Sequence, residues 1–312
     1  MKIAVGISGG VDSAVAALLL RDEGHDLVGV TMTLGRADEA KSLSEAQAVA
    51  ERLGIELKVF DFAGEWREKV IDYIKTSYLK GETPNPCVRC NELVKFGLLP
   101  EAAFASGCDY FATGHYARLI NGRLARAVDR SKDQSYFLYR VRSEILKRTI
   151  FPLGELKKSE IREIARKFGF EAAEREDSQD FCGGEVMELI NRAPEKGNTV
   201  TRLGKVLGQH EGFWNYTIGQ RKGLGIGGGG TPYYVVELKP ETNEVVVAPR
   251  EEALSYELSL ADTTGLIDMT KPVKVRSAGE PRLLKNGILG VAPGQSAVFY
   301  DGDIIIGGGI IK

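Results

Sequence analysis

The sequence has no long apolar run and contains few cysteines, histidines or tryptophans. Its 312 residues include four cysteines, three histidines and two tryptophans. No stretch approaches the roughly 18 unbroken apolar residues that a membrane-spanning helix needs, so we expect no membrane association. The apolar core and cleavage site of a secretory signal are also missing, because Met1 and Lys2 lead directly into the strand-like residues 3–7.

These absences predict a cytoplasmic protein, in which free thiols stay reduced. Four cysteines in such a chain favour metal or sulfur chemistry over structural disulfides. The net charge of −2 and the pI near 6.1 exclude a basic protein that coats nucleic acid without specificity. An RNA partner would therefore require positive charge that is local.

The first half of the sequence alternates between strand and helix patterns. Strands are expected at residues 2–7, 26–33, 56–60 and 110–114. Helices are expected at residues 12–23, 44–53, 66–79, 95–105 and 157–168. Strands that are separated by helices of this length predict an α/β fold with a parallel sheet and helices on both of its faces.

The pattern changes at about residue 195, where glycine becomes frequent and helical periodicity ends. Short β-branched runs follow at residues 233–238, 244–248, 273–276, 287–291, 296–300 and 303–306. Short strands with Gly and Asp turns are typical of small β-barrels or sandwiches. We therefore predict an α/β domain over residues 1–194, a central β-rich domain over 195–249 and a C-terminal β-barrel over 250–312.

A glycine-rich loop, Ser8-Gly9-Gly10-Val11-Asp12-Ser13, follows the first strand and opens the first helix. Glycines let the backbone approach a phosphate closely, and free amides at a helix N-terminus favour the anion. Ser8 and Ser13 add hydroxyl donors, and Asp12 is expected to cap the helix or to hold a magnesium ion. No Gly-Lys-Ser/Thr follows, so the loop is not a Walker A motif. It resembles instead the pyrophosphate loop of ATP pyrophosphatases, which cleave ATP to AMP and pyrophosphate.

Three cysteines form a second candidate site. Cys87 and Cys90 lie three residues apart on a proline-braced loop, and Cys182 lies where the α/β pattern ends. The three thiols are either ligands of a metal or iron–sulfur site with one open position, or Cys90 and Cys182 form a persulfide relay. Cys108 leads into an apolar strand and is expected to be a buried bystander.

Seven segments, in order, resemble the bacterial tRNA-specific 2-thiouridylase family over nearly the whole chain. They are GISGGVDSAVAALLL, TPNPCVRCNELVKF, ATGHYARL, KDQSYFLY, DSQDFCG, GQHEGFWNYTIGQRKGLGIGG and APGQSAVFYDGDIIIGGGII. The resemblance implies an adenine nucleotide alpha hydrolase-like domain followed by two small β domains. It also implies that ATP adenylates the 2-carbonyl oxygen of the wobble uridine in tRNAs for Lys, Glu and Gln. Sulfur then replaces that oxygen and AMP departs.

The resemblance further implies the residues of each site. ATP, with Mg²⁺, would be held by Gly6, Ile7, Ser8, Gly9, Gly10, Val11, Asp12, Ser13, Met32 and Gly114. The unstacked target base would be surrounded by Asn85, Pro86, His115, Lys132, Asp133 and Gln134. Arg276 and Gln295 match positions that contact tRNA, and Cys90 and Cys182 would be the catalytic cysteines. A cysteine desulfurase or free sulfide would supply the sulfur. A core position for Met32 and a loop cap for Gln134 are the structural alternatives.

Two departures from the family pattern affect this prediction. Many members have an Asp where this chain has Cys87, so any role of that Asp does not carry over. The change completes a three-cysteine set, Cys87, Cys90 and Cys182, as found in related tRNA thiolases that use a [4Fe–4S] cluster. We therefore expect such a cluster, with a cluster-free persulfide relay as the alternative. The second departure is a short connection over residues 33–44, which leaves the tRNA contacts of that edge undefined.

Two other functions compete with tRNA thiolation. Another pyrophosphate-loop adenylating synthetase, acting on a small molecule, would need neither the cysteines nor the β domains. A non-catalytic sulfur or metal sensor that binds tRNA would not need the intact loop after the first strand. The sequence therefore favours an ATP-dependent tRNA-uridine 2-sulfurtransferase.

Overall fold

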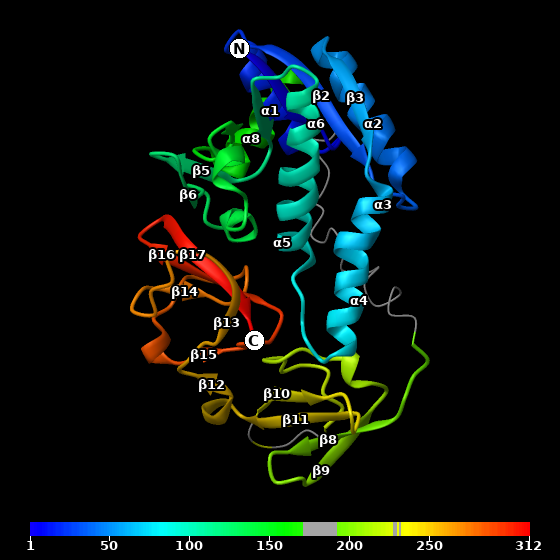
Figure 1. Ribbon diagram of the computed structural model, residues 1–312, viewed down its shortest axis with the longest axis vertical. Coiled ribbons are helices and arrows are strands. Elements are labelled where there is room, and N and C mark those ends of the chain that lie inside the picture. The colour runs from blue at the N-terminus through cyan, green and yellow to red at the C-terminus, as the bar shows by residue number, and fades with distance from the viewer. Residues whose placement is uncertain (171–191, 227–229, 231) are drawn as a thin grey trace. The chain divides into compact units, whose positions relative to one another are not determined.

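The computed structural model describes residues 1–170, 192–226, 230 and 232–312 (Figure 1). The chain forms two compact units. The first unit contains Met1–Val70, Cys87–Gln179 and Gly302–Ile305, and the second contains Ile71–Pro86, Asp180–Asp301 and Ile306–Lys312. Each unit is thus assembled from segments that are distant in the sequence.

A five-stranded parallel sheet organises the first unit. Its strand order is β3 (Glu56–Asp61), β2 (Asp26–Thr33), β1 (Lys2–Gly6), β4 (Tyr110–Thr113) and β7 (Thr149–Ile150). Every neighbouring pair runs parallel, with Lys2 opposite Asp26 and Ile3 opposite Tyr110. The α/β fold class and four of these strands are confirmed, whereas the short β7 was not predicted.

Helices pack against this sheet through apolar side chains. The helix after β1, α1 (Val11–Asp22), contacts α2 (Glu39–Leu53), α8 (Lys158–Phe168) and three of the strands. Val15 of α1 and Ile3 of β1 are fully buried in the core that these elements share. Burial of this apolar face provides the main driving force for the α/β arrangement.

Two helices differ from the sequence prediction in their boundaries. α2 begins at Glu39 and not at residue 44, and Asp38 and Glu39 place acidic groups at its positive N-terminal end. The helix expected over residues 66–79 is divided into α3 (Ala63–Trp66), a π-helical stretch (Arg67–Ile71) and α4 (Asp72–Leu79).

The cysteine segment is helical, so the predicted loop is wrong. α5 (Pro86–Cys90) leads into the π-helical stretch η2 (Asn91–Leu98) and then into α6 (Leu99–Ala105). Pro86 occupies the first helical position. A backbone N–H there would have no intrahelical acceptor, so its absence in proline costs no hydrogen bond, and the fixed φ of proline suits the helix. Cys87 and Cys90 therefore lie on a helix that begins well before the predicted start at residue 95.

A β-hairpin that the sequence analysis missed follows β4. β5 (Ala117–Ile120) pairs with β6 (Arg123–Arg126) around Asn121 and Gly122, whose φ angles are 51° and 74°. Two positive φ angles favour an Asn-Gly pair in a two-residue hairpin turn. Ile304, the first residue of β17, pairs with Ala125 of β6 and extends this hairpin.

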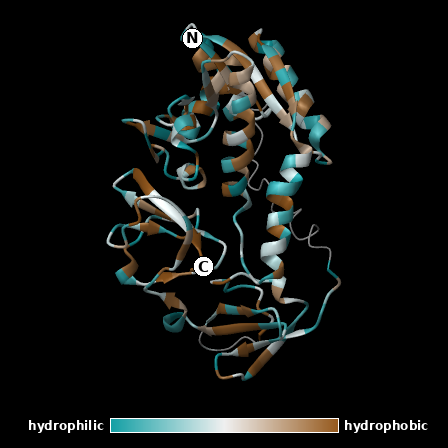
Figure 2. Ribbon diagram, viewed as in Figure 1, coloured by the Kyte–Doolittle hydropathy of each residue, from teal (hydrophilic) through white to brown (hydrophobic). Residues whose placement is uncertain are grey.

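The central part of the second unit is a four-stranded mixed sheet. Its order is β10 (Tyr233–Lys239), β11 (Glu244–Pro249), β8 (Gly197–Thr201) and β9 (Val206–His210). β11 runs parallel to β8, and the other two pairs are antiparallel. Figure 2 shows hydrophobic colouring along β10 and β11, whose buried valines pack against Phe213 and Trp214.

The C-terminal part of the second unit contains an antiparallel sheet. β14 (Val273–Lys274), β16 (Ser296–Asp301) and β17 (Ile304–Ile311) are neighbours, and β13 (Leu260–Gly265) also pairs with β17. Two short strands, β12 (Leu254–Ser255) and β15 (Ile288–Leu289), pair beside it. The domain limits at residues 194 and 249 stay predictions. In the part of the chain that the structure describes, no helix is long and apolar enough to cross a membrane.

Candidate active site

The loops after β1 and β4 meet at the topological switch point of the parallel sheet. From β1 the chain continues to β2 on one side, and it later returns to β4 on the other side of β1. Ligands of open α/β sheets bind in the crevice at the carboxyl ends of two such strands. Residues 8–13 follow β1, and residues 114–116 follow β4. Residues predicted from two distant motifs therefore lie together at this edge of the sheet.

The loop after β1 is held in shape by its serines. The Ser13 hydroxyl donates to the Gly10 carbonyl at 2.9 Å and accepts the Ser8 N–H at 3.2 Å. The two serine hydroxyls lie 3.3 Å apart. Gly10 is the N-cap residue of α1, so the predicted helix cap by Asp12 is wrong. The first amides of α1 border the crevice, where they favour an anion such as a phosphate.

Two glycines allow the elements around this loop to approach closely. Gly9 has a φ of 81°, and a Cβ atom there would lie 2.5 Å from the Cβ of Glu45 on α2. A Cβ atom on Gly114 would lie 2.7 Å from the carbonyl carbon of Asp12 and 2.8 Å from the Ser13 nitrogen. Real Cβ atoms do not approach backbone atoms this closely, so only glycine fits at position 114. The structure thus brings Gly114 against the first turn of α1.

The Asp12 side chain connects α1, on which it lies, to the loop after β4 and to α8. Its Oδ1 accepts the Tyr116 hydroxyl at 2.7 Å. The Lys158 ammonium group donates to Oδ1 at 2.7 Å and to Oδ2 at 2.9 Å. Lys158 is the first residue of α8, and its backbone N–H donates to Asp129 at 3.0 Å. A buried cation is therefore fixed beside the loop, where it balances the charge of Asp12.

Tyr116 and Lys158 are site residues that the sequence analysis did not single out. Tyr116 lies directly after two predicted residues, Gly114 and His115, so its position in that motif was a usable signal. Lys158 carried no local signal. Its proximity to Asp12 follows from the position of β7 beside β4, because α8 starts shortly after β7.

The turn that contains Lys132, Asp133 and Gln134 supports Tyr116. Gln134 accepts the Tyr116 N–H through Oε1 at 2.9 Å and donates its own N–H to the Tyr116 carbonyl at 2.9 Å. Asp133 accepts two backbone N–H groups at 3.1 and 3.2 Å, and its other oxygen lies 3.5 Å from the Arg126 guanidinium. These bonds hold the turn against the residue that contacts Asp12.

His115 is a neutral group at this site. Its Nδ1 lies 2.9 Å from the Thr113 hydroxyl oxygen, and its ring centre lies 5.3 Å from that of Phe96. Burial, together with the Lys95 cation, lowers the pKa of His115 to about 3. The imidazole therefore offers hydrogen bonds and no charge at neutral pH. Met32 is half-buried near the end of β2, opposite Phe60.

Cys87 and Cys90 lie on one face of α5, because helical residues three apart are neighbours. Cys87 is half-buried and Cys90 is 1% exposed. Burial raises the pKa of the Cys90 thiol, an effect that Lys95 opposes and Cys87 reinforces. The stretch η2 that continues α5 carries Phe96, whose ring contacts His115, so it packs beside the β4 loop.

The third predicted cysteine, Cys182, lies outside the described residues. Within the described residues, no group of three or more His, Cys, Asp or Glu side chains is arranged to hold a metal ion. The structure therefore provides two of the three predicted ligands and leaves the set untested. Cys108 is 4% exposed, which confirms that it is buried.

Four predicted substrate residues belong to the second unit. Asn85 and Pro86 are half-buried. Arg276 is exposed and donates from Nη2 to the Leu289 carbonyl at 2.6 Å. Gln295 donates from its side-chain amide to the Thr83 carbonyl at 2.9 Å. This last bond reaches the segment that precedes the cysteine helix.

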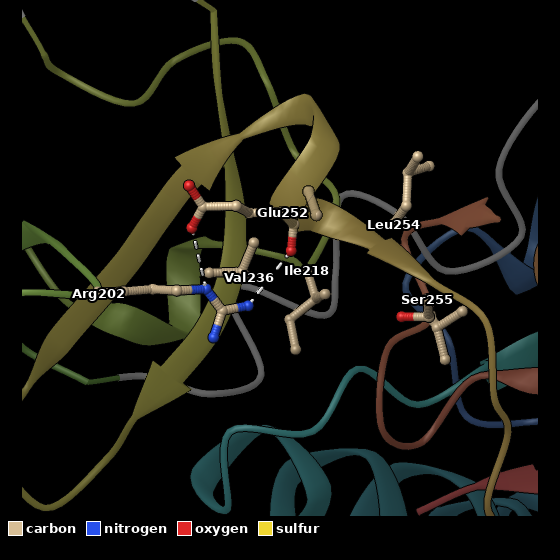
Figure 3. A pocket seen from close by; sticks show the side chains of 8 residues that line it. Arg202, Ile218, Val236, Glu252, Leu254 and Ser255 are labelled. Atoms are coloured by element: carbon tan, nitrogen blue, oxygen red, sulfur yellow. Dashed lines mark hydrogen bonds and ion pairs between the residues drawn. The ribbon is translucent and has the colours of Figure 1, made fainter.

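A small polar pocket of about 100 Å³ lies in the second unit (Figure 3). Arg202 and Glu252 point toward each other at its wall, with 3.7 Å between Arg202 Nε and the Glu252 carboxylate. Ile218 and Val291 contribute apolar lining. None of the predicted site residues lines this pocket, and its arginine is already paired, so it adds nothing to the candidate site.

Three family descriptions match the chain in order. They are a tRNA methyl transferase HUP domain over residues 1–183, a tRNA methyl transferase PRC-barrel domain over 188–249 and an aminomethyltransferase β-barrel domain over 283–311. An α/β domain followed by two small β domains is therefore confirmed.

Full-length relatives give the same result. The tRNA-specific 2-thiouridylase MnmA of Nostoc sp. is 41% identical over 349 residues, which cover 100% of this chain and 98% of that protein. The protein of the same name from Clostridium acetobutylicum is 39% identical over 100% of this chain and 99% of its own length. That of Synechocystis sp. is 42% identical over 99% of this chain and 96% of its own length. Because such identity extends over the whole sequence, the chain belongs to the tRNA-specific 2-thiouridylase family.

Proposed function

We propose that this chain is an ATP-dependent tRNA-uridine 2-sulfurtransferase, which makes 2-thiouridine at the wobble position of tRNAs for Lys, Glu and Gln. The observation that carries the proposal is the loop after β1, closed by Gly114 and joined to Lys158 through Asp12 at the switch point of the sheet. Identity of 39–42% with tRNA-specific 2-thiouridylases over their full length supports it.

The first half-reaction activates the base. The 2-carbonyl oxygen of uridine attacks the α-phosphorus of ATP, and the bond to the β-phosphate breaks to release pyrophosphate. Negative charge grows on the phosphate oxygens during this step. The first amides of α1 and the Lys158 ammonium group would stabilise that charge. A Mg²⁺ ion bound with the phosphates would be held by Asp12, whose oxygens already accept the Tyr116 hydroxyl and the Lys158 ammonium group.

The second half-reaction introduces sulfur. AMP is a better leaving group than a carbonyl oxygen, so a sulfur nucleophile attacks carbon 2 and the bond from that carbon to the AMP oxygen breaks. Cys87 and Cys90, one helical turn apart, have a spacing that fits two thiolate ligands, and Cys182 is the proposed third. A [4Fe–4S] cluster on these thiols would supply an iron without a protein ligand for the incoming sulfide.

The remaining site residues are proposed to hold the RNA. Asn85, Pro86, His115 and the turn at residues 132–134 would surround the unstacked base, with neutral His115 as a hydrogen-bonding group. Arg276 would contact the phosphate backbone. The sulfur donor would be a cysteine desulfurase or free sulfide, and the reaction would take place in the cytoplasm, where the tRNA substrate is.

The deciding experiment supplies the chain with ATP, Mg²⁺, sulfide and a tRNA-Lys transcript in the absence of oxygen. We expect AMP and 2-thiouridine in equal amounts, measured by chromatography and by mass spectrometry of digested tRNA. A transcript with cytidine at the wobble position serves as the matched control and should yield neither product. Formation of AMP without RNA, driven by a small-molecule acceptor, would contradict the proposal and favour a small-molecule synthetase.

Iron analysis distinguishes the two sulfur mechanisms. We expect about four iron atoms and four acid-labile sulfides per chain, as in a [4Fe–4S] protein, when the protein is prepared without oxygen. Cys87→Ala should lose them, whereas Cys108→Ala should keep them. Iron-free protein that still thiolates tRNA, with a cysteine desulfurase in place of sulfide as the source of sulfane sulfur, would instead make Cys182 the persulfide carrier and Cys90 its partner.

A further inference from the structure

The short connector between α4 and α5 is bound by the C-terminal β part of the second unit. Thr83 and Pro84 in this connector are buried, although they belong to no helix or strand. The Thr83 N–H donates to the Pro293 carbonyl at 2.7 Å. Buried backbone groups need such partners, and here the partner comes from a segment more than two hundred residues later.

The Gln295 side chain makes the second contact with the connector. Its amide nitrogen donates to the Thr83 carbonyl at 2.9 Å and lies 3.4 Å from the Pro84 carbonyl oxygen. A glutamine amide carries two N–H donors, which matches two adjacent carbonyls. The two residues that this amide holds immediately precede Asn85 and the first residue of α5, Pro86.

Gly294 lets the chain approach Thr83 closely enough for the hydrogen bonds to the connector to form. Its φ is +87°, and a Cβ atom there would lie 3.0 Å from the Thr83 carbonyl carbon and 3.1 Å from its nitrogen. A larger residue would be strained and would push the connector away. Pro293, Gly294 and Gln295 thus form one binding element, which we name the clasp.

The clasp is anchored in the last strand of the fold. The Gly294 N–H donates to the Ile311 carbonyl at 2.9 Å, and the Ile311 N–H donates to the Gln295 carbonyl at 2.8 Å. Ile311 is 3% exposed at the end of β17. The clasp is therefore hydrogen-bonded to the end of β17, so it provides a fixed support for the connector.

We propose that Gln295 is a positioning residue for sulfur transfer, which holds the start of the cysteine helix α5 through the connector. Cys87 is the second residue of α5, so the backbone that the clasp fixes is four residues or fewer from this thiol. The role rests on the proposed function, and it assigns Gln295 to the cysteine segment in place of the tRNA contact that the family resemblance implies. The C-terminal β part would then fix the backbone that leads into α5.

The test removes the donors of Gln295 and leaves its size unchanged. Gln295→Met has a similar length without N–H groups, and Gln295→Glu places an acceptor against two carbonyls. Gln209→Met is the matched control, because Gln209 is exposed in β9 of the same unit. Gly294→Ala, which displaces the connector by contact, should act in the same direction as the Gln295 variants.

Two readouts on the full-length protein decide the proposal. In the Gln295 and Gly294 variants without tRNA, hydrogen–deuterium exchange should be faster than in the wild type in the peptide covering residues 80–90. With tRNA, kcat for 2-thiouridine formation should fall about tenfold or more, since a misplacement near 1 Å can lower a rate about a hundredfold. The KM for tRNA should change less than twofold. Unchanged melting temperatures would show that the variants are folded.

Three outcomes would overturn the proposal. A raised KM for tRNA with normal kcat would make Gln295 an RNA contact only. Faster exchange with normal kcat and KM would make the clasp purely structural, and slow turnover with unchanged exchange would separate Gln295 from the connector. If the wild-type chain does not thiolate tRNA, the proposed function itself fails, and the exchange data still report whether the clasp holds residues 80–90.

Discussion

The Lys158 ammonium group lies 2.7 Å and 2.9 Å from the two carboxylate oxygens of Asp12, although the residues are 146 positions apart in the chain. We expect Lys158→Met, which keeps the length of the side chain and removes its charge, to lower tRNA-dependent AMP formation about a hundredfold. Loss of one fixed donor to developing charge typically has an effect of this size. Steady-state assays with ATP and tRNA would measure it.

The neighbouring lysine provides the control for this prediction. Lys157 is exposed and precedes α8, so Lys157→Met removes the same charge outside the crevice. It should leave AMP formation within twofold of the wild-type rate. Equal losses in the two variants would show that the effect comes from net charge and would contradict a specific role for Lys158.

His115 should make the stability of the protein depend on pH. Its pKa is lowered to about 3 in the folded chain, mainly by burial, compared with 6.5 for an ordinary histidine. Between these values the unfolded chain binds a proton that the folded chain does not. The free energy of unfolding therefore rises with pH across this window, by at most about 1.4 kcal/mol per pH unit. The contribution that depends on neutral His115 is fully present above pH 6.5.

Urea unfolding at pH 5, 6 and 7 would measure this effect in the wild type and in His115→Gln. The variant should lose less stability than the wild type between pH 7 and pH 5. Burial also lowers the pKa of His210, but this residue is present in both proteins, so its contribution cancels in the comparison. Parallel pH dependence in the two proteins would show that His115 is not held in its neutral form.

Gly114→Ala should weaken ATP binding. The new methyl group would lie 2.7 Å from the Asp12 carbonyl carbon, so either the β4 loop or the first turn of α1 must move. Calorimetric titration should show at least a tenfold higher Kd for ATP, because phosphate binding depends on these amides. Gly64→Ala on α3 is the control, since nothing lies within 4 Å of its added Cβ atom. Tight ATP binding by Gly114→Ala would show that this contact does not shape the site.

The sequence predicted the parallel sheet well because its strands are locally encoded. Residues 26–33 form a run of mostly apolar residues bounded by charged and turn residues, and the structure has β2 over the same residues. The hairpin of β5 and β6 was equally local, with Asn121 and Gly122 as its turn signal, but it was overlooked. The prolines at residues 84 and 86 predict a loop, but Pro86 opens a helix, so the residue pattern does not reveal the cysteine helix.

The contacts that complete the site could not be predicted in this way. The Asp12–Lys158 pair depends on the position of β7 beside β4, and the bond from Gln295 to Thr83 connects residues 212 positions apart. No residue pattern within either segment specifies its partner. These contacts follow from the tertiary arrangement of whole elements, and the sequence indicates only which side chains have the chemistry to take part.

Arg276 should contribute one phosphate contact to tRNA binding. It is exposed in the second unit, and its guanidinium group has five N–H donors, one of which donates to the Leu289 carbonyl. We expect Arg276→Ala to raise the Kd for tRNA about three- to tenfold at moderate salt. The slope of log Kd against log salt concentration should fall by about one, as for the loss of a single phosphate contact.

Arg202→Ala tests whether the effect of Arg276→Ala on tRNA binding depends on the position of the lost charge. Arg202 belongs to the same unit and is also exposed, but it is paired with Glu252 at the wall of the pocket in Figure 3. Both variants change the net charge by the same amount, so long-range attraction to RNA changes equally in each. A change in the salt slope for Arg276→Ala alone would therefore identify a local contact, because counterions are released only where an arginine meets a phosphate. Equal slopes for the two variants would remove Arg276 from the tRNA-binding surface.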